Sequence, residues 1–316
     1  MPGYRIRHIT RYSYPSPVID SANQVMLFPL DDETQQLKKH DLRITHQPPV
    51  EVFTDYFGNK VGIFSVVKPH HELTIESLIE VVTQEARIPE STVDAAAQWA
   101  NLEELREQVP YMDFLSTEHT EPEISAMAST KLNKNLSPFS IAQEISSFVY
   151  DHFEYKKGIT NVETKVDEIW KLKAGVCQDF AHVALVMLRI IGIPARYVSG
   201  YICPKDQELR GEGATHAWVE AYIPFHGWIG LDPTNNCIAS DRHVRLAIGR
   251  SFLDCTPVKG TYKGSSEHTL EVSVTIGNEP SKKEAETISP VFTYRVANPA
   301  TPDNSYRKFM EMQQQQ

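Results

Sequence analysis

The chain has 316 residues, of which 41% are hydrophobic and 23% charged, an ordinary composition for a globular chain of one large or two modest domains. Its formal net charge of −10 argues against nucleic acid or an anionic membrane surface as a partner. No stretch is apolar enough to span a bilayer, the first residues show no signal region, and the four cysteines form no C-x-x-C pair. We therefore expect a cytoplasmic protein.

Strand periodicity dominates the N-terminal part of the chain. The alternating positions that share one face are Tyr4, Ile6, His8, Thr10 and Tyr12. Residues 61–67 and 73–81 continue the alternation after a turn at Gly58 and Asn59. The pattern predicts a small antiparallel β-sandwich over residues 1–82, which we interpret as an accessory domain.

Helical signals follow the β region. Residues 83–136 are polar and weakly periodic, with a predicted helix over 91–108, and we interpret them as a linking layer that reaches over a functional cleft. Ser137 and Pro138 begin a clear amphipathic helix and open a domain predicted over residues 137–277. Within that domain, alternation over 269–276 predicts a strand that closes its sheet. Residues 278–316 are expected to be largely disordered, with at most an edge strand over 291–296.

One segment places a cysteine where its thiolate is favoured. Gly175 interrupts the chain, and from Cys177 the sequence predicts a helix that is apolar almost all round and ends at Gly192. A thiol in the first turn lies near unpaired backbone N–H groups and the positive end of the helix dipole. The alternative is a buried structural cysteine, which is common in proteins. His182, off the face of the thiol, is interpreted as a core histidine.

A predicted hairpin supplies the partners that a nucleophilic cysteine requires. Residues 215–223 and 228–232 alternate as strands around a turn at 224–227. This hairpin brings Asp232 back to within about one diagonal neighbour of His216. A thiol nucleophile needs a base, and the base needs a third group to fix its tautomer. Cys177, His216 and Asp232 therefore form a candidate catalytic triad.

Three blocks of the chain resemble, in order, those of the transglutaminase-like superfamily. They read Gly175-Val-Cys177, Thr215-His216-Ala-Trp218-Val-Glu220 and Gly227-Trp228-Ile-Gly-Leu-Asp232-Pro-Thr. More narrowly, the chain is similar to bacterial transglutaminase-like proteins described as cysteine proteases, and residues 4–82 resemble their accessory β-domain. The resemblance implies an α+β, papain- or transglutaminase-like core in which a cysteine-bearing helix packs on an antiparallel sheet. It also implies Cys177 as nucleophile, His216 as general base and acid, and Asp232 as the residue that orients it.

Four further residues are candidates for the oxyanion hole or for substrate binding. The backbone N–H of Cys177 is one natural oxyanion donor. Animal transglutaminases take a second donor from an upstream tryptophan, for which Trp170 is a candidate here, and Tyr155 is the alternative. Gln178, which follows Cys177, and Trp218, two residues after His216, complete the set. A tryptophan on a strand, however, more often packs the sheet.

The expected chemistry is acyl transfer through a thioester on an amide or peptide bond. Water as acceptor gives a cysteine protease or amidase, and an amine gives a transglutaminase. We favour hydrolysis because the calcium loops and extra β-barrels of the animal cross-linking enzymes are not found in the sequence.

No cofactor is expected: no D-x-D-x-D-G loop suggests calcium, and local spacing for a four-ligand zinc site is missing. The alternatives are a zinc protein using Cys177, His216 and Asp232, and a non-catalytic binding module. The expected partner is a peptide, protein or small amide substrate. The sequence does not indicate an oligomeric state.

Overall fold

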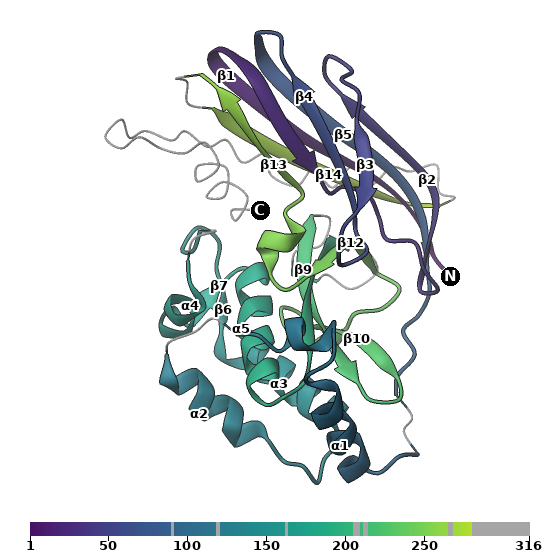
Figure 1. The fold of residues 1–316 in the computed structure, drawn as a ribbon, viewed down its shortest axis with the longest axis vertical. Helices are drawn as coiled ribbons and strands as arrows, with labels where there is room; N and C mark the ends of the chain where they lie inside the picture. The colour runs from purple at the N-terminus through teal and green to yellow at the C-terminus, as the bar shows by residue number, and fades with distance from the viewer. Residues whose placement is uncertain are drawn as a thin grey trace.

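The computed structural model describes residues 1–89, 92–117, 121–161, 164–204, 209–210, 214–264 and 268–279. Its N-terminal domain is built around one long strand, β1 (Gly3–Val25), which takes part in two antiparallel sheets (Figure 1). The first half of β1 lies between β5 (His70–Thr83) and β14 (Thr269–Glu279), with β2 (Gln35–Ile44) on the outer edge of β5. The second half lies between β4 (Lys60–Val66) and β13 (Val258–Lys263), with β3 (Glu51–Thr54) beside β4.

A second unit, here called the core domain, combines a five-stranded antiparallel sheet with helices. The strand order is β11-β10-β9-β8-β12. These strands are β8 (Ala195–Ile202), β9 (Thr215–Ile223), β10 (Gly227–Asp232), β11 (Cys237–Ile238) and β12 (His243–Gly249). The helices are α1 (Ala95–Leu105), α2 (Pro122–Lys131), α3 (Pro138–His152), α4 (Val166–Leu172) and α5 (Cys177–Ile190). Two short 3-10 turns, η1 (Tyr111–Phe114) and η2 (Phe252–Cys255), and a parallel pair, β6 (Glu154–Tyr155) and β7 (Ala174–Gly175), complete it.

Helix α5 is the centre of the core domain, as its apolar sequence predicts. It packs against β8 and β9 and is surrounded by α2, α3 and α4 (Figure 1). Gly192, with φ of +86°, ends the helix, and the N–H groups of Gly192 and Ile193 bond back to carbonyls in its last turn. Helix α3 begins where predicted, because the Ser137 hydroxyl accepts the backbone N–H of Ser140. Among the described residues, no helix is long and apolar enough to cross a membrane.

Three sequence predictions need correction or lie outside the described residues. The strand over 269–276 exists as part of β14, but it pairs with β1 of the N-terminal domain and not with the core sheet. Alternation alone reveals that one face is buried but not which sheet covers it, and Ile276 in fact lies opposite Ile6. The helix predicted over 91–108 is shorter, because Asp94 caps α1 and the helix ends at Leu105. The disordered tail predicted over 278–316 is wrong at residues 278 and 279, which belong to β14. The rest of that prediction, including the edge strand over 291–296, lies outside the described residues, which end at 279.

Candidate active site

Cys177 is the first residue of α5 and is 7% exposed. The carboxylate of Asp179 closes this helix end by accepting the backbone N–H of Val176 at 2.8 Å and the Thr160 hydroxyl at 2.7 Å. Gly175 leaves room for that carboxylate, since a Cβ there would lie 2.7 Å from the Cβ of Asp179. Asp179, whose role the sequence does not reveal, thus fixes the backbone that presents the thiol.

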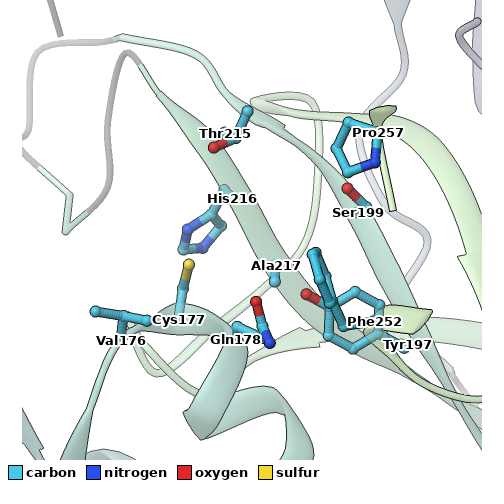
Figure 2. Close-up of a pocket in the computed structure, with 10 residues that line it drawn as sticks. All are labelled: Val176, Cys177, Gln178, Tyr197, Ser199, Thr215, His216, Ala217, Phe252 and Pro257. Carbon is cyan, nitrogen blue, oxygen red and sulfur yellow. The ribbon is translucent and has the colours of Figure 1, made fainter. Parts of the chain in front are cut away.

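His216 and Asp232 meet as the predicted hairpin requires. Leu231 pairs with Val219 in the β9–β10 ladder, so the next residue, Asp232, comes level with Trp218. His216 precedes Trp218 by two residues on the same face of β9, which makes it the diagonal neighbour of Asp232. Nε2 of His216 lies 2.8 Å from Oδ2 of Asp232, and both side chains are fully buried. Figure 2 shows Sγ of Cys177 directed at the His216 ring. Nδ1 of that ring makes no hydrogen bond to any described residue, which leaves it for the thiol proton.

The pair is strongly polarised. Burial by itself would lower the pKa of His216, but the Asp232 carboxylate and the Cys177 thiol raise it to about 10. Burial would likewise raise the pKa of Asp232, yet His216 and then His243 hold it well below its usual range. At neutral pH the arrangement therefore favours an imidazolium over a neutral ring.

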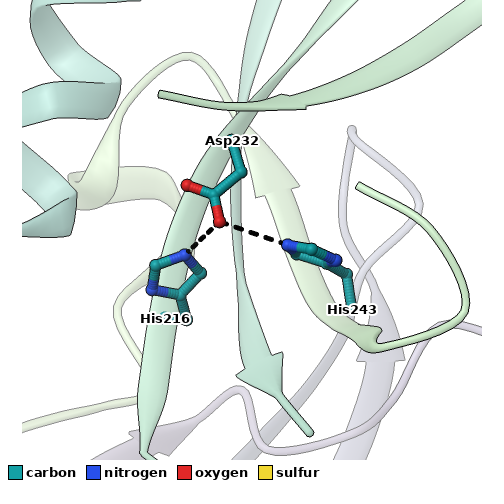
Figure 3. Close-up of side chains that lie close together, drawn as sticks. All are labelled: His216, Asp232 and His243. Atoms are coloured by element: carbon teal, nitrogen blue, oxygen red, sulfur yellow. Dashed lines mark hydrogen bonds and ion pairs between the residues drawn. The ribbon is translucent and has the colours of Figure 1, made fainter. Parts of the chain in front are cut away.

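Asp232 has further donors that the sequence analysis missed. Its Oδ1 accepts the backbone N–H of Thr234 at 2.9 Å, and its Oδ2 accepts the Asn235 amide at 2.7 Å. His243, the first residue of β12, places Nε2 3.2 Å from the same Oδ2 (Figure 3). The only sequence signal near His243 is the alternation of β12, which predicts a strand but not its contact with Asp232.

A small pocket lies beside the thiol. Its volume is about 30 Å³, and it is lined by Cys177, His216 and eight neighbours, namely Val176, Gln178, Tyr197, Ser199, Thr215, Ala217, Phe252 and Pro257 (Figure 2). None of these residues comes from the stretch 83–136, so the expected linking layer does not border this pocket. Nε2 of Gln178 is buried without a hydrogen-bond partner among the described residues, which makes it an available donor at the pocket.

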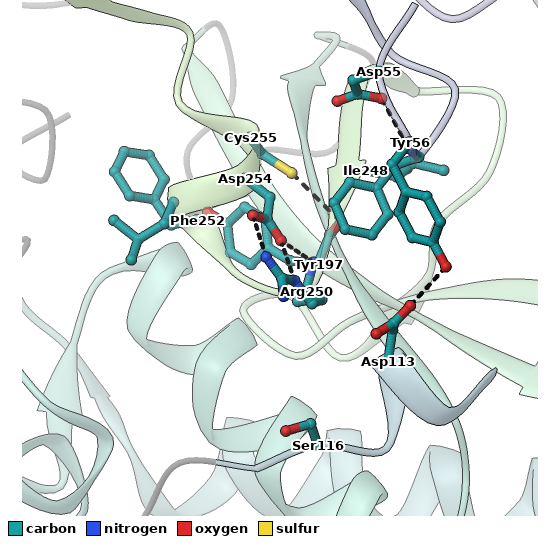
Figure 4. Close-up of polar contacts among 12 residues, drawn as sticks. Asp55, Tyr56, Asp113, Ser116, Tyr197, Ile248, Arg250, Phe252, Asp254 and Cys255 are labelled. Atoms are coloured by element: carbon teal, nitrogen blue, oxygen red, sulfur yellow. Dashed lines mark hydrogen bonds and ion pairs between the residues drawn. The ribbon is translucent and has the colours of Figure 1, made fainter. Parts of the chain in front are cut away.

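One wall of the pocket comes from the connection between the core sheet and β13. Phe252 begins η2, which is stabilised by Asp254: its Oδ2 accepts the backbone N–H and the Nε–H of Arg250, each at 2.9 Å (Figure 4). The backbone N–H of Phe252 is directed to Nε2 of His182 at 3.3 Å. Burial lowers the pKa of His182 to about 4, so this ring is a neutral core acceptor, as predicted. The wall is thus a hydrogen-bonded segment rather than a loose loop.

Two of the four supporting candidates are corrected by the structure. The indole N–H of Trp170 is directed to the Glu123 carboxylate on α2 at 3.3 Å, so it is not an oxyanion donor. Trp218 is fully buried between His216 and His243, and its ring fills the space that Gly200 leaves open, so it packs the sheet and does not line the pocket.

The other two candidates lie near the thiol. Gln178 lines the pocket. Tyr155 lies opposite Gly175 in the β6–β7 pair, and burial together with Cys177 raises its pKa well above the usual value. Its hydroxyl is therefore a neutral group close to the site, although Tyr155 does not line the pocket.

The zinc alternative does not fit these side chains. His216 uses Nε2 for Asp232 and has only Nδ1 left for Cys177, so the ring separates the two and one ion cannot bind all three. Donor atoms of His216, Asp232 and His243 do lie within 4.8 Å of one another. Their nitrogen–oxygen separations of 2.8 and 3.2 Å are those of hydrogen bonds, which account for the cluster.

Comparisons with known proteins agree with this architecture. The chain matches the model of the transglutaminase-like superfamily over residues 125–233 and that of the bacterial transglutaminase-like N-terminal region over residues 4–82. Uncharacterized protein ML0607 of Mycobacterium leprae is 31% identical over 277 residues, which is 86% of this chain and 97% of that protein. A protein-glutamine gamma-glutamyltransferase of Pseudomonas aeruginosa is 30% identical over 156 residues, 46% of this chain and 21% of that protein. A solved structure of a proposed cysteine protease from Cytophaga hutchinsonii has a TM-score of 0.67 at 22% identity, covering 89% of this chain and 92% of that one.

The fold is that of a mixed α and β protein with a transglutaminase-like or papain-like core, preceded by an antiparallel β domain. The chain belongs to the transglutaminase-like superfamily and has relatives of nearly its own length in mycobacteria.

Proposed function

We propose that the protein is a thiol-dependent enzyme that cleaves amide or peptide bonds, with Cys177 as nucleophile. The observation that carries the proposal is the arrangement of the His216 ring. Its Nε2 is bound to the buried Asp232, whereas its Nδ1 is free among the described residues and the Cys177 thiol points at the ring. A base held in one orientation beside a thiol at a helix N-terminus is the arrangement that nucleophilic catalysis needs.

The reaction proceeds in two balanced halves. The Cys177 thiolate attacks the amide carbonyl carbon, and the backbone N–H of Cys177, with the Gln178 amide, stabilises the oxyanion. Collapse of the intermediate breaks the C–N bond, and the leaving amine takes the proton from His216. His216 then removes a proton from the acceptor, which attacks the thioester and releases the Cys177 thiolate.

We favour water as the acceptor because of the size of the pocket. A cavity of about 30 Å³ accommodates one or two waters, and Thr215, Ser199 and Gln178 offer polar groups around it. Transfer to an amine is the second candidate, because the Pseudomonas aeruginosa relative bears the name of a glutamyltransferase.

The test measures how the thioester is resolved. Wild-type protein is incubated with glutamine-containing peptides and a small primary amine in ¹⁸O-labelled water, and products are read by mass spectrometry. We expect hydrolysed products carrying one ¹⁸O to predominate over amine adducts, and Cys177→Ala to form neither. Cys237→Ala, which removes a cysteine outside the pocket, is the matched control and should behave as wild type.

Two outcomes would contradict the proposal. Predominant amine adducts at low amine concentration would make the protein a transglutaminase. Equal product from wild type and Cys177→Ala would remove Cys177 from the chemistry. Absence of turnover with a selectively reactive Cys177 would exclude these peptides and direct the search to small amides.

A further inference from the structure

His243 is held in a single tautomer. Its Nδ1 accepts the backbone N–H of Ser240 at 3.3 Å, so the ring proton is on Nε2. That proton points at Oδ2 of Asp232, 3.2 Å away (Figure 3). His243 is therefore a donor to the same carboxylate oxygen that binds His216.

The second imidazole stays neutral while the first carries the charge. The titratable and charged groups that face His243 are Asp232, His216 and Arg242. Burial, with the positive charges of His216 and Arg242, lowers the pKa of His243 and outweighs the attraction of Asp232. A neutral donor can stabilise the Asp232 carboxylate without competing with His216 for the proton.

The strand that carries His243 is fixed by the N-terminal domain. β12 is the edge strand of the core sheet and pairs with β8 on one side. Beyond that pairing, the side-chain amide of Gln35 bonds both backbone groups of Arg245, at 2.7 and 2.9 Å. The side-chain amide of Asn59 bonds both backbone groups of Ile248, each at 2.8 Å. Each buried amide thus takes the place of a neighbouring strand.

We propose that His243 is a positioning residue for the Asp232–His216 pair, and that the N-terminal domain sets its position by binding β12 through Gln35 and Asn59. This inference rests on the proposed function, because it assigns His243 a task only if Asp232 orients a working base. It gives the accessory domain an indirect role in the chemistry: the domain holds β12, the core-domain strand that carries His243 against Asp232.

The experiment compares two replacements of His243 in the full-length protein. His243→Leu removes the donor, whereas His243→Gln keeps an N–H at a similar reach. The readout is the pH profile of Cys177 alkylation by iodoacetamide, measured by mass spectrometry with melting temperature alongside. His243→Leu should slow alkylation below neutral pH by about tenfold or more, the effect of one hydrogen bond to a charged group. His243→Gln should restore most of that rate.

Matched variants separate positioning from general destabilisation. His8 is also buried and neutral, and its Nδ1 lies 2.8 Å from the Tyr201 hydroxyl outside the pocket. His8→Leu should lower the melting temperature without moving the alkylation profile. Gln35→Met and Asn59→Leu should move the profile in the direction of His243→Leu, and they test the same effect should His243→Leu not fold.

The outcomes distinguish failure of the inference from failure of the proposed function. If wild-type Cys177 shows no selective alkylation, the proposed function fails. If wild type is selective and His243→Leu keeps the same profile, the positioning role of His243 is overturned. If His243→Leu shifts the profile but Gln35→Met and Asn59→Leu do not, the role of the N-terminal domain is overturned. A shift in His8→Leu as large as in His243→Leu would reduce the effect to lost stability.

Discussion

Replacing Gly175 by alanine tests how the helix end that carries the thiol is constructed. The added Cβ would lie 2.7 Å from the Cβ and 2.8 Å from the Cγ of Asp179. Asp179 cannot yield freely, because it is buried and holds the Val176 N–H and the Thr160 hydroxyl. We expect an overpacking cost of about 1–3 kcal/mol and about 1 kcal/mol from the weakened helix cap. Together these amount to roughly 2–4 kcal/mol, or a fall in Tm of roughly 3–6 °C for a chain of 316 residues.

The assay pairs thermal unfolding, followed by circular dichroism, with iodoacetamide labelling of Cys177. Gly277→Ala is the matched control, because a Cβ at Gly277 would meet nothing within 4 Å. We expect Gly175→Ala to lower both Tm and the labelling rate, and Gly277→Ala to change neither. If Gly175→Ala melts with the wild type and labels equally fast, the close packing of Asp179 does not position the thiol and the reasoning is refuted.

Further expectations follow from the same geometry. Cys177 should be alkylated below neutral pH faster than Cys237, because burial and the nearby Asp232 carboxylate raise the pKa of Cys237 to about 12. Faster labelling of Cys237 would contradict the assignment of Cys177 as nucleophile. Asp232→Asn should lower turnover by about 10²- to 10⁴-fold without unfolding, as seen when an orienting carboxylate is neutralised, and near-normal kinetics would remove it from the site. Turnover should decline at alkaline pH with an apparent pKa near 10, because His216 holds the proton for the leaving amine only below that value. A rate that still rises above that pH would argue against His216 as the general acid. Trp170→Phe should keep turnover within about twofold, since its N–H is directed to Glu123, and a large loss would restore it as an oxyanion donor.

The sequence predicts the parts of the site that depend on local spacing. Hairpin register determines where Asp232 lies relative to His216, and the register follows from alternation and the turn at 224–227. The start of α5 at Cys177 follows from the apolar helix pattern. These features need no knowledge of distant segments.

Other parts depend on contacts that no local pattern encodes. His243 lies next to Asp232 because β12 pairs with β8 and is bound by Asn59, a residue far away in the sequence. The pairing of β14 with β1 also joins residues far apart in the sequence, so the alternation of residues 269–276 does not reveal which sheet they enter. Trp170 is a candidate donor only through the family resemblance, and the direction of its N–H is set by Glu123 on another helix.

The pairing of β1 with both β5 and the late strands β13 and β14 has a consequence for how the chain is made. The core domain is inserted into the N-terminal domain between β5 and β13, so the ribosome releases β1 and β5 well before β13 and β14. The edge of β1 that does not face β5 stays uncovered until β14 is made. Until then, an unpaired edge from Gly3 to Ser13 is open to association with other chains. A fragment that ends after residue 82 would keep that edge permanently exposed. An isolated version of this domain should therefore carry residues 258–279, joined by a short linker in place of the inserted core.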